Sequence, residues 1–264
     1  RVRTLAVRDE PGDWFSLGAT REMPLGALDV ILMRKDPPFD MEYIYTTYLL
    51  ERAAEAGALV VNRPAALRDV NEKASIAWFA DCAPPTLIAR DIEAMQGFLA
   101  EHRRIVVKPL DGMGGRSIFV IAEGDRNRNV ILETLTDSGR RFAMAQAYLP
   151  EIVNTGDKRI LLIDGEPVPY ALARIPAEGE NRGNLVMGAR GEGRELTERD
   201  RWICARVGPA LMERGVLFAG LDVIGDYLTE INITSPTGIR EIERAFPVNI
   251  SARLLDAIET RIAH

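Results

Sequence analysis

Oxygen-bearing side chains recur along Gly220–Thr237, which reads GLDVIGDYLTEINITSPT. Two short apolar runs flank Gly225-Asp226, a pattern typical of a β-hairpin. On the second run Glu230 and Asn232 alternate with isoleucines, and side chains two positions apart share one face of a strand. Mg²⁺ prefers such oxygen ligands, usually a carboxylate or two together with phosphate oxygens and waters. The stretch therefore suggests a site for one hard cation.

The turn of this hairpin decides where Asp222 points. A two-residue turn would pair Asp222 with Thr229 and place Asp222 and Glu230 on opposite faces. A three-residue turn, Gly225 to Tyr227, sets Asp222 opposite Glu230 on the same face. We favour the three-residue turn, because it gathers two carboxylates and the Asn232 amide around one cation. The alternative is the exposed face of an ordinary surface hairpin.

The composition narrows the class of protein. The chain has 264 residues, of which 47% are hydrophobic and 27% charged, an ordinary soluble composition for one to three domains. The net charge of −6 argues against a general nucleic-acid binder. No apolar run approaches the ~20 residues of a membrane span, and no signal-peptide pattern is seen. Cys82 and Cys204 lack CxxC spacing, and we interpret both as buried thiols of a cytoplasmic protein.

The scarcity of histidine and lysine limits the chemistry further. His102 and His264 are the only histidines, so a Ser-His-Asp or Cys-His mechanism and a His-ligated zinc site are disfavoured. The reaction must then use carboxylates, arginine, lysine, backbone amides and a hard metal. The chain has only four lysines, Lys35, Lys73, Lys108 and Lys158. A chain that otherwise uses arginine is expected to keep lysine where a compact point charge is needed.

The first clear strand is Leu28–Met33, and residues 1–20 before it are polar and loosely patterned. A helix over 41–56, with Asp40 as its N-cap, and a strand over Ala58–Asn62 complete a βαβ unit, so a parallel sheet begins here. Ligands bind beyond the carboxyl ends of such strands, which places Arg34 at the edge of a predicted site. The alternative for Arg34 is a solvated loop charge.

A short strand over Thr86–Ala89 and a helix capped by Asp91 lead to a strand over Arg104–Leu110, and two motifs lie before and after these elements. Asp69 and Glu72 form a D-x-x-E capping signal that predicts a helix through Ala80, with Lys73 in its first turn. Lys108 lies among apolar neighbours, and lysine is rarely buried without an anion. The glycines of DGMGG then bring backbone amides close to phosphate, but no helix follows them as in a Walker A motif. We predict a glycine-rich hairpin lid over nucleotide phosphates; the alternative is an ordinary flexible hairpin.

A second antiparallel pair, Arg159–Asp164 and Pro167–Ile175, is predicted around Asp164-Gly165. Arg159 and Arg174 lie near its open ends and can converge on one anion. Residues 177–196 are long, rich in glycine and arginine and poor in apolar residues, so we expect a lid that closes over anions. In the SPTG segment, hydroxyls and free amides could hold a small carboxylate.

With these motifs placed, the chain resembles the ATP-grasp superfamily and, within it, the bacterial glutathione synthetases. The motifs that carry the resemblance are LMRKDPPFD, VNRP, RDVNEK, VVKPLDGMGG, MAQAYLP, GDKRILLIDGEPVPYALARIP, RGNL and GLDVIGDYLTEINITSPTGIREIE. DPPFD and NITSPTGIREIE separate this family from other ATP-grasp ligases. The family begins with a further βα segment, which is truncated or diverged here, and tends to have a glycine pair where this lid has Gly188-Ala189.

The resemblance implies an α/β (α+β) ATP-grasp fold. Its parts would be an N-terminal parallel-sheet domain over residues 1–67, a small subdomain over 68–140 and a C-terminal subdomain over 141–264 with the lid at 177–196. The implied activity is ATP-dependent ligation of glycine to γ-glutamylcysteine through an acyl phosphate, with Mg²⁺ or Mn²⁺ as cofactor, in a homo-oligomer. The alternatives are another ATP-grasp carboxylate–amine ligase, for dipeptides or glutamate, and a non-catalytic ATP-binding regulatory protein.

The resemblance also implies roles for individual residues. The nucleotide would be bound by Lys73, Lys108, Gly112, Met113, Gly114, Gly115, Gln146, Tyr148 and Leu149. Substrate would be bound by Arg34, Arg159, Arg174, Arg182, Ser235, Pro236 and Thr237, with Arg159 and Arg174 as the catalytic cations. The metal ligands would be Asp222, Glu230 and Asn232, in agreement with the hairpin argument.

Overall fold

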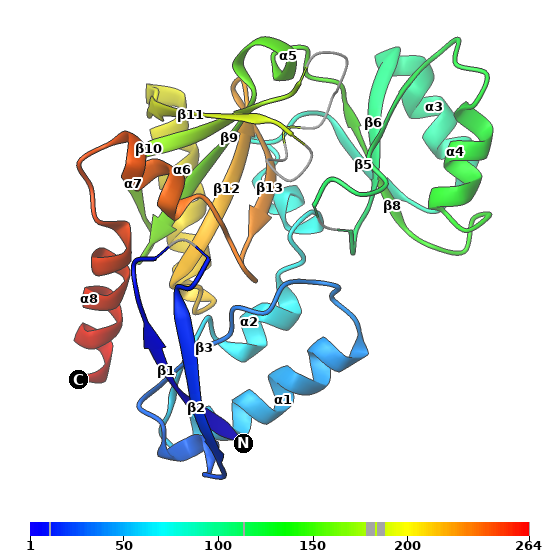
Figure 1. Ribbon diagram of the computed structural model, residues 1–264. Coiled ribbons are helices and arrows are strands. Elements are labelled where there is room, and N and C mark those ends of the chain that lie inside the picture. Colours follow the sequence, from blue (N-terminus) through cyan, green and yellow to red (C-terminus); the bar gives the residue numbers. More distant parts are fainter. Residues whose placement is uncertain (11, 113, 178–182, 184–187, 264) are drawn as a thin grey trace.

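A computed structural model describes residues 1–10, 12–112, 114–177, 183 and 188–263 (Figure 1). Its two main sheets are antiparallel, with four and five strands, and a two-stranded parallel sheet and an N-terminal hairpin complete the strands. Among the described residues, none of the helices has both the length and the apolar character that crossing a membrane requires.

The βαβ unit predicted near the N-terminus is confirmed. β3 (Val30–Leu32) and β4 (Leu59–Val61) pair in parallel, and α1 (Met41–Glu55) connects them. The helix begins at Met41 because the Asp40 side chain accepts a hydrogen bond from the Tyr43 amide at 2.9 Å. Both strands are shorter than expected, and a turn of 3₁₀ helix, η1 (Leu25–Ala27), comes before the first.

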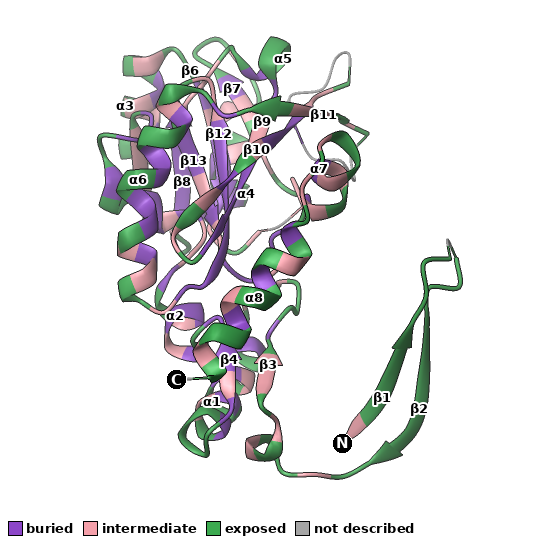
Figure 2. Cartoon of the chain, turned by 90° about the vertical axis from the view of Figure 1, so that its left-hand side faces the viewer, coloured by how far each residue is buried: buried purple, intermediate pink, exposed green. Residues whose placement is uncertain are grey.

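The hairpin of β1 (Val2–Val7) and β2 (Phe15–Arg21) was missed by the sequence reading. It extends away from the body of the molecule, and nearly all of its residues are exposed (Figure 2). β1 reads VRTLAV and does not alternate between apolar and polar residues, which is the signal on which strand prediction depends. In β2 the signal was present, because Phe15, Leu17 and Ala19 alternate with more polar residues.

The helix predicted from Asp69 and Glu72 is wrong. α2 (Pro64–Asp69) begins with a proline at its first turn and ends at Asp69, and a 3₁₀ helix, η2 (Ala74–Phe79), follows without a side-chain cap. Proline is favoured at the first helical position, so Pro64 marks the true start. Glu72 instead uses its side chain to bind backbone amides of a distant segment, Ile233 and Thr234.

The four-stranded sheet consists of β5 (Thr86–Ala89), β6 (Arg104–Pro109), β7 (Phe119–Ala122) and β8 (Ala143–Ala147), in the order β5-β8-β6-β7. α3 (Ile92–His102) and α4 (Arg128–Leu135) pack on one face and close a small core around Met95, Leu99 and Ile105. Because β8 belongs to this sheet, the sheet runs to Ala147, past the boundary at residue 140 expected from the sequence.

The five-stranded sheet has the order β11-β10-β9-β12-β13 and is antiparallel throughout. Its strands are β9 (Asp157–Ile163), β10 (Glu166–Ile175), β11 (Arg190–Glu195), β12 (Phe218–Ile224) and β13 (Tyr227–Asn232). The helices of this part are α5 (Ile152–Thr155), α6 (Glu198–Glu213), α7 (Ile239–Ala245) and α8 (Ile250–Ile262).

Alternation along β9 divides the core of this part into two layers. Ile160 and Leu162 join the cluster that contains α6, whereas Leu161 and Ile163 join the cluster that contains α7 and α8. The same period of two sends Lys158 toward α6, where it pairs with the buried Asp200 at 2.5 Å. Asp157 and Arg159 are therefore left to face the cleft between the two large sheets.

Candidate functional site

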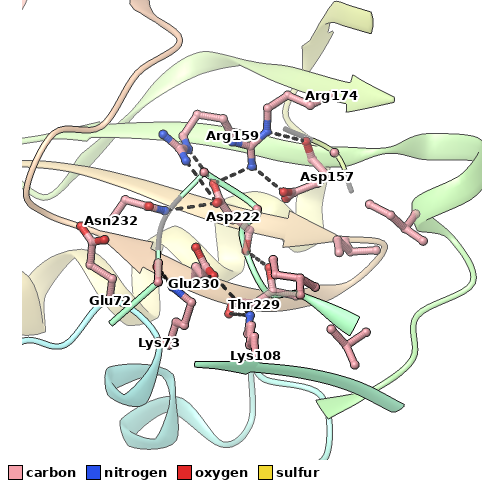
Figure 3. Close-up of a pocket in the computed structure, with 18 of the residues that line it drawn as sticks. Glu72, Lys73, Lys108, Asp157, Arg159, Arg174, Asp222, Thr229, Glu230 and Asn232 are labelled. Atoms are coloured by element: carbon pink, nitrogen blue, oxygen red, sulfur yellow. Dashed lines mark hydrogen bonds and ion pairs between the residues drawn. The ribbon is translucent and has the colours of Figure 1, made fainter. Parts of the chain in front are cut away.

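A cleft of about 490 Å³ is lined by residues from both large sheets. Figure 3 shows acidic and basic side chains converging in it from β6, β9, β10, β12 and β13 and from the segment before η2. Those labelled are Glu72, Lys73, Lys108, Asp157, Arg159, Arg174, Asp222, Thr229, Glu230 and Asn232. The cleft has the size of a small-molecule site, and its lining carries side chains of both charges.

Asp222 and Glu230 lie opposite each other on β12 and β13, as predicted from the hairpin. The predicted turn was wrong, however. Ile224 pairs with Tyr227, so the turn has the two residues Gly225 and Asp226, and an irregularity in register next to Asp222 restores the pairing with Glu230. A β-bulge inserts one extra residue into one strand and so changes which side chains share a face.

Two arginines converge on the carboxylate of Asp222. Arg159 donates through Nε at 2.6 Å and Nη2 at 3.1 Å, and Nη2 of Arg174 lies 3.0 Å from Oδ1. The sequence predicted that Arg159 and Arg174 meet on one anion, and in the structure this anion is Asp222. Burial alone would raise the pKa of Asp222, but the two guanidinium groups hold it well below its usual range.

Two lysines converge on Glu230 in the same way. Lys73 Nζ lies 3.4 Å and Lys108 Nζ 3.3 Å from Glu230 Oε1, and both lysine side chains are almost completely buried. Burial lowers the pKa of Lys108, and it opposes the lowering of the Glu230 pKa by the lysines. Lys73 also donates to the carbonyl of Gly112 at 2.6 Å, so it connects this pair to the glycine-rich loop.

Asp157 is a cleft residue that the sequence reading missed. Its Oδ2 accepts from Arg174 Nη2 at 2.5 Å, while its Oδ1 is buried without a hydrogen-bond partner in the described structure. Burial raises the pKa of Asp157 to about 7, with Arg174 acting against this shift. The available signal was its position two residues before Arg159, which puts both side chains on one face of β9.

The raised pKa of Asp157 predicts a pH dependence of stability. A carboxyl that binds its proton more tightly when folded stabilises the protein at low pH, and this contribution falls by up to about 1.4 kcal/mol per pH unit as pH rises from ~4 toward 7. Asp157→Asn should therefore flatten the decline in unfolding free energy over this range, as measured by denaturant titration at pH 5, 6, 7 and 8. An unchanged slope in the variant would contradict this assignment.

The residues predicted to bind nucleotide lie along one side of the cleft. Gly112, Gly114, Gly115, Gln146, Tyr148 and Leu149 all line it together with both lysines. Gly114 and Gly115 have φ of +64° and +75°, which favours glycine and leaves their backbone open to a ligand. Met113 lies outside the described residues, as does Arg182 of the predicted lid.

Arg34, which was predicted at the edge of the site, contacts the edge of the cleft without lining it. It does not appear among the described residues that line the cleft; instead its Nη2 donates to the carbonyl of Pro236 at 2.9 Å, and its guanidinium lies over the ring of Phe218. Ser235 and Thr237 do line the cleft, on either side of Pro236. Arg34 therefore contacts the loop that carries these two residues.

The predicted metal ligands form a set of oxygen donors on one face of the hairpin. Within the described part of the chain no cluster of three or more His, Cys, Asp or Glu side chains suits a metal, so Asn232 is needed beside Asp222 and Glu230. Asn232 Nδ2 lies 3.2 Å from Asp222 Oδ2. Two carboxylates and an amide are hard ligands, and in kind they fit Mg²⁺ or Mn²⁺.

Comparison with protein families gives two matches that together span most of the chain. Residues 1–68 match the model of the prokaryotic glutathione synthetase N-terminal domain. Residues 72–247 match the model of the prokaryotic glutathione synthetase ATP-grasp domain.

Curated relatives match over nearly the whole chain. The chain is 62% identical over 263 residues to the glutathione synthetase of Pseudomonas aeruginosa, covering 100% of this chain and 83% of the relative. It is 59% identical over 261 residues to the glutathione synthetase of Escherichia coli K12, covering 99% of this chain and 82% of the relative.

Solved structures with low sequence identity share the fold. D-cycloserine synthetase DcsG superposes with a TM-score of 0.71 at 16% identity, over 91% of this chain and 86% of that one. The ATP-grasp ligase PsnB, solved with a phosphomimetic variant of a minimal precursor, Mg and ADP, gives 0.64 at 19% identity, over 98% and 86% of the two chains.

Proposed function

Because this chain belongs to the prokaryotic glutathione synthetase family, we propose that its cleft uses ATP to join γ-glutamylcysteine to glycine. The chain is an ATP-dependent carboxylate–amine ligase with the ATP-grasp fold. In the proposed reaction a cysteinyl carboxylate oxygen attacks the γ-phosphorus of ATP, ADP leaves, and an acyl phosphate forms. The glycine amine then attacks the acyl carbon, loses a proton and expels phosphate, which gives glutathione.

The charges of the cleft are the observation that supports this chemistry most directly. Among the charged residues that line the cleft, four cationic side chains form ion pairs with three carboxylates: Lys73, Lys108, Arg159 and Arg174 with Asp157, Asp222 and Glu230. Phosphoryl transfer requires positioning and neutralisation of charge more than a titrating base. A cleft without histidine among its described residues is therefore adequate for the reaction.

We assign the side of the cleft nearest the four-stranded sheet to ATP. Lys73 and Lys108 would bind the phosphates, and the loop at 112–115, Met113 included, would cover them. Gln146, Tyr148 and Leu149 follow each other at the end of β8 and would lie beside the adenine. Support comes from the lining of the cleft, in which the lysines and this segment occur together.

Asp222, Glu230 and Asn232 would hold Mg²⁺ or Mn²⁺, which when bound neutralises phosphate charge and polarises the transferred group. Asp222 is paired with arginine and Glu230 with lysine in this structure. To bind the metal, these two carboxylates would have to give up their ion pairs. Arg159 and Arg174, once released from Asp222, can bind the carboxylate of the dipeptide and the charge that develops on the transferred phosphoryl group.

The acceptor would bind at the loop that follows β13. Ser235 and Thr237 face the cleft and would hold the glycine carboxylate, with Pro236 between them. Arg34 would contribute by fixing this loop through Pro236. Arg182 would contribute as part of the predicted lid, although the last residues of that lid, Arg190–Glu195, instead form β11 of the five-stranded sheet. An acyl phosphate hydrolyses when wet, so a lid that excludes water suits the reaction.

The division of the chain also remains a proposal. We assign residues 1–67 to the dipeptide side of the site, the four-stranded sheet to the nucleotide and the five-stranded sheet to the metal and acceptor. That the protein works in the cytoplasm as a homo-oligomer is a prediction from the sequence, supported for the compartment by two buried cysteines that form no disulfide.

The proposal predicts which substrates the purified protein requires. Phosphate release from ATP with Mg²⁺ should need γ-glutamylcysteine and glycine together, and should stay at background with either alone. Substituting D-alanine or glutamate for glycine should give little turnover. Equal turnover with D-alanine pairs or glutamate would indicate another ligase of this fold, and no turnover with any acceptor would favour a non-catalytic ATP-binding protein.

A further inference from the structure

The loop after β13, residues 233–237, has no regular secondary structure, yet four side chains from other parts of the chain form hydrogen bonds with its backbone. We call it the acceptor loop. Asn62 donates to the carbonyl of Ile233 at 2.8 Å, and Glu72 accepts from the amides of Ile233 and Thr234. Further along, Arg34 donates to the Pro236 carbonyl and Arg159 to the Thr237 carbonyl. Side chains, and not a ladder of strands, therefore determine where this loop lies.

Glu72 makes the densest of these contacts. Its Oε1 accepts three hydrogen bonds, from the Ile233 amide at 3.0 Å, the Thr234 amide at 3.1 Å and the Thr234 hydroxyl at 2.8 Å. Its own carbonyl accepts from the Ile231 amide at 2.8 Å. Each of the other three side chains makes one hydrogen bond to the loop, so Glu72 makes more contacts with it than any of them.

The position of Glu72 in the chain connects the two ends of the cleft. The next residue, Lys73, contacts Glu230 and the carbonyl of Gly112 at the glycine-rich loop. Glu72 itself contacts Thr234, directly before Ser235. Two consecutive residues, Glu72 and Lys73, thus connect the side of the cleft assigned to phosphate with the side assigned to the acceptor.

We propose that Glu72 is a positioning residue for the acceptor amine. It fixes the acceptor loop so that Ser235 and Thr237 hold the glycine carboxylate and the amine meets the acyl phosphate. This inference rests on the proposed function and adds a residue to it. Because a misplacement of about 1 Å can cost on the order of 100-fold in rate, a firm hold on this loop matters for the second step of the reaction.

The role requires an oxygen acceptor and no proton transfer. Oε1 is already engaged by three donors, and an amide oxygen could replace it in accepting them. Glu72→Gln should therefore keep most of the function that Glu72→Ala loses. If Glu72 exchanged a proton with the amine, the two variants would be equally impaired.

The test measures phosphate release by the full chain while glycine, γ-glutamylcysteine and ATP are varied in turn. For Glu72→Ala we expect KM for glycine to rise about 10- to 100-fold, with KM for ATP changed less than about 3-fold, as for loss of an outer-shell support. Glu72→Gln should stay within about 3-fold of wild type for glycine. Thr234→Val keeps the side-chain volume but loses one donor, and it should raise KM for glycine in the same selective way.

Glu243→Ala is the matched control. Glu243, on α7, also accepts two backbone amides through Oε1, from Ile250 at 2.8 Å and Ser251 at 3.0 Å, but these amides belong to the start of α8. It should lower stability without a selective change in KM for glycine.

Two results would overturn the positioning role. One is a glycine KM that stays at the wild-type value in Thr234→Val and in any folded Glu72→Ala protein. The other is a Glu72→Gln variant as impaired as Glu72→Ala. Thr234→Val decides the matter alone if Glu72→Ala fails to fold. Wild-type protein without glycine-dependent turnover would instead reject the proposed function itself.

Discussion

Replacing Glu230 by glutamine is expected to slow phosphate release from ATP by about 100- to 1000-fold, the usual cost of removing one preorganised charge from a reacting site. Glu230 lies between Lys73 and Lys108 and is one of two carboxylates proposed to hold the metal. Glutamine keeps the volume of the side chain but removes the negative charge. The variant should also need a higher Mg²⁺ concentration for half-maximal rate, which a titration of the rate with Mg²⁺ measures.

Glu230→Gln should lose stability but remain folded, so that its turnover can be measured. Both lysines keep a second acceptor, the Gly112 carbonyl for Lys73 and the Thr229 carbonyl for Lys108. We expect a loss in unfolding free energy of about 3 to 5 kcal/mol, as for a buried ion pair that loses one partner. Glu51→Gln, which weakens the surface pair with Arg68, is the control and should leave turnover unchanged. If denaturant unfolding shows that Glu230→Gln mainly unfolds the protein, Glu230 is a structural residue.

Gly220→Ala is expected to lower kcat/KM for glycine about 100-fold, because it displaces two parts of the site at once. A Cβ at Gly220 would lie 2.8 Å from Cδ of Arg159 and 3.0 Å from Cβ of Pro236. A displaced Arg159 would also pull on the Thr237 carbonyl, to which it donates a hydrogen bond. Steady-state kinetics with glycine varied would measure the loss.

Gly97→Ala is the control for this substitution. Gly97 lies on the exposed side of α3, and nothing lies within 4 Å of a Cβ built there. Alanine in a helix is more favourable than glycine by about 1 kcal/mol, so Gly97→Ala should raise stability and leave kinetics unchanged. Wild-type kinetics in Gly220→Ala would show that Arg159 and Pro236 can shift without consequence.

The local parts of the fold were predictable because their signals lie close together in the sequence. Asp40 and Asp91 cap helices where expected, each accepting from the amide three residues on. The alternation in β13 likewise placed Glu230 and Asn232 on one face. The pairing of Asp222 with Glu230 was predicted correctly, but from the wrong turn, because a bulge and a longer turn give the same pairing beyond the loop.

Contacts between distant segments were not predictable in this way. Arg34 is separated by 202 residues from Pro236, whose carbonyl it binds, and Glu72 by 162 residues from Thr234. In each pair, the residues around one member give no indication of where the other member lies. The sequence predicts Glu72 to be a capping residue that accepts hydrogen bonds from amides close to it in the chain. In the structure it accepts from amides of a distant segment, and the sequence does not distinguish the two cases.

The ion pairs inside the cleft favour binding of the anionic ligand and the metal ion together over binding of either one alone. An anion that arrived alone would compete with Asp222 for the arginines and leave that carboxylate buried without a counter-ion. A metal ion that arrived alone would leave the arginines facing its own charge. A complex of the two would offer each group a replacement partner, so we expect the protein to bind a metal–nucleotide complex more tightly than free nucleotide or free metal.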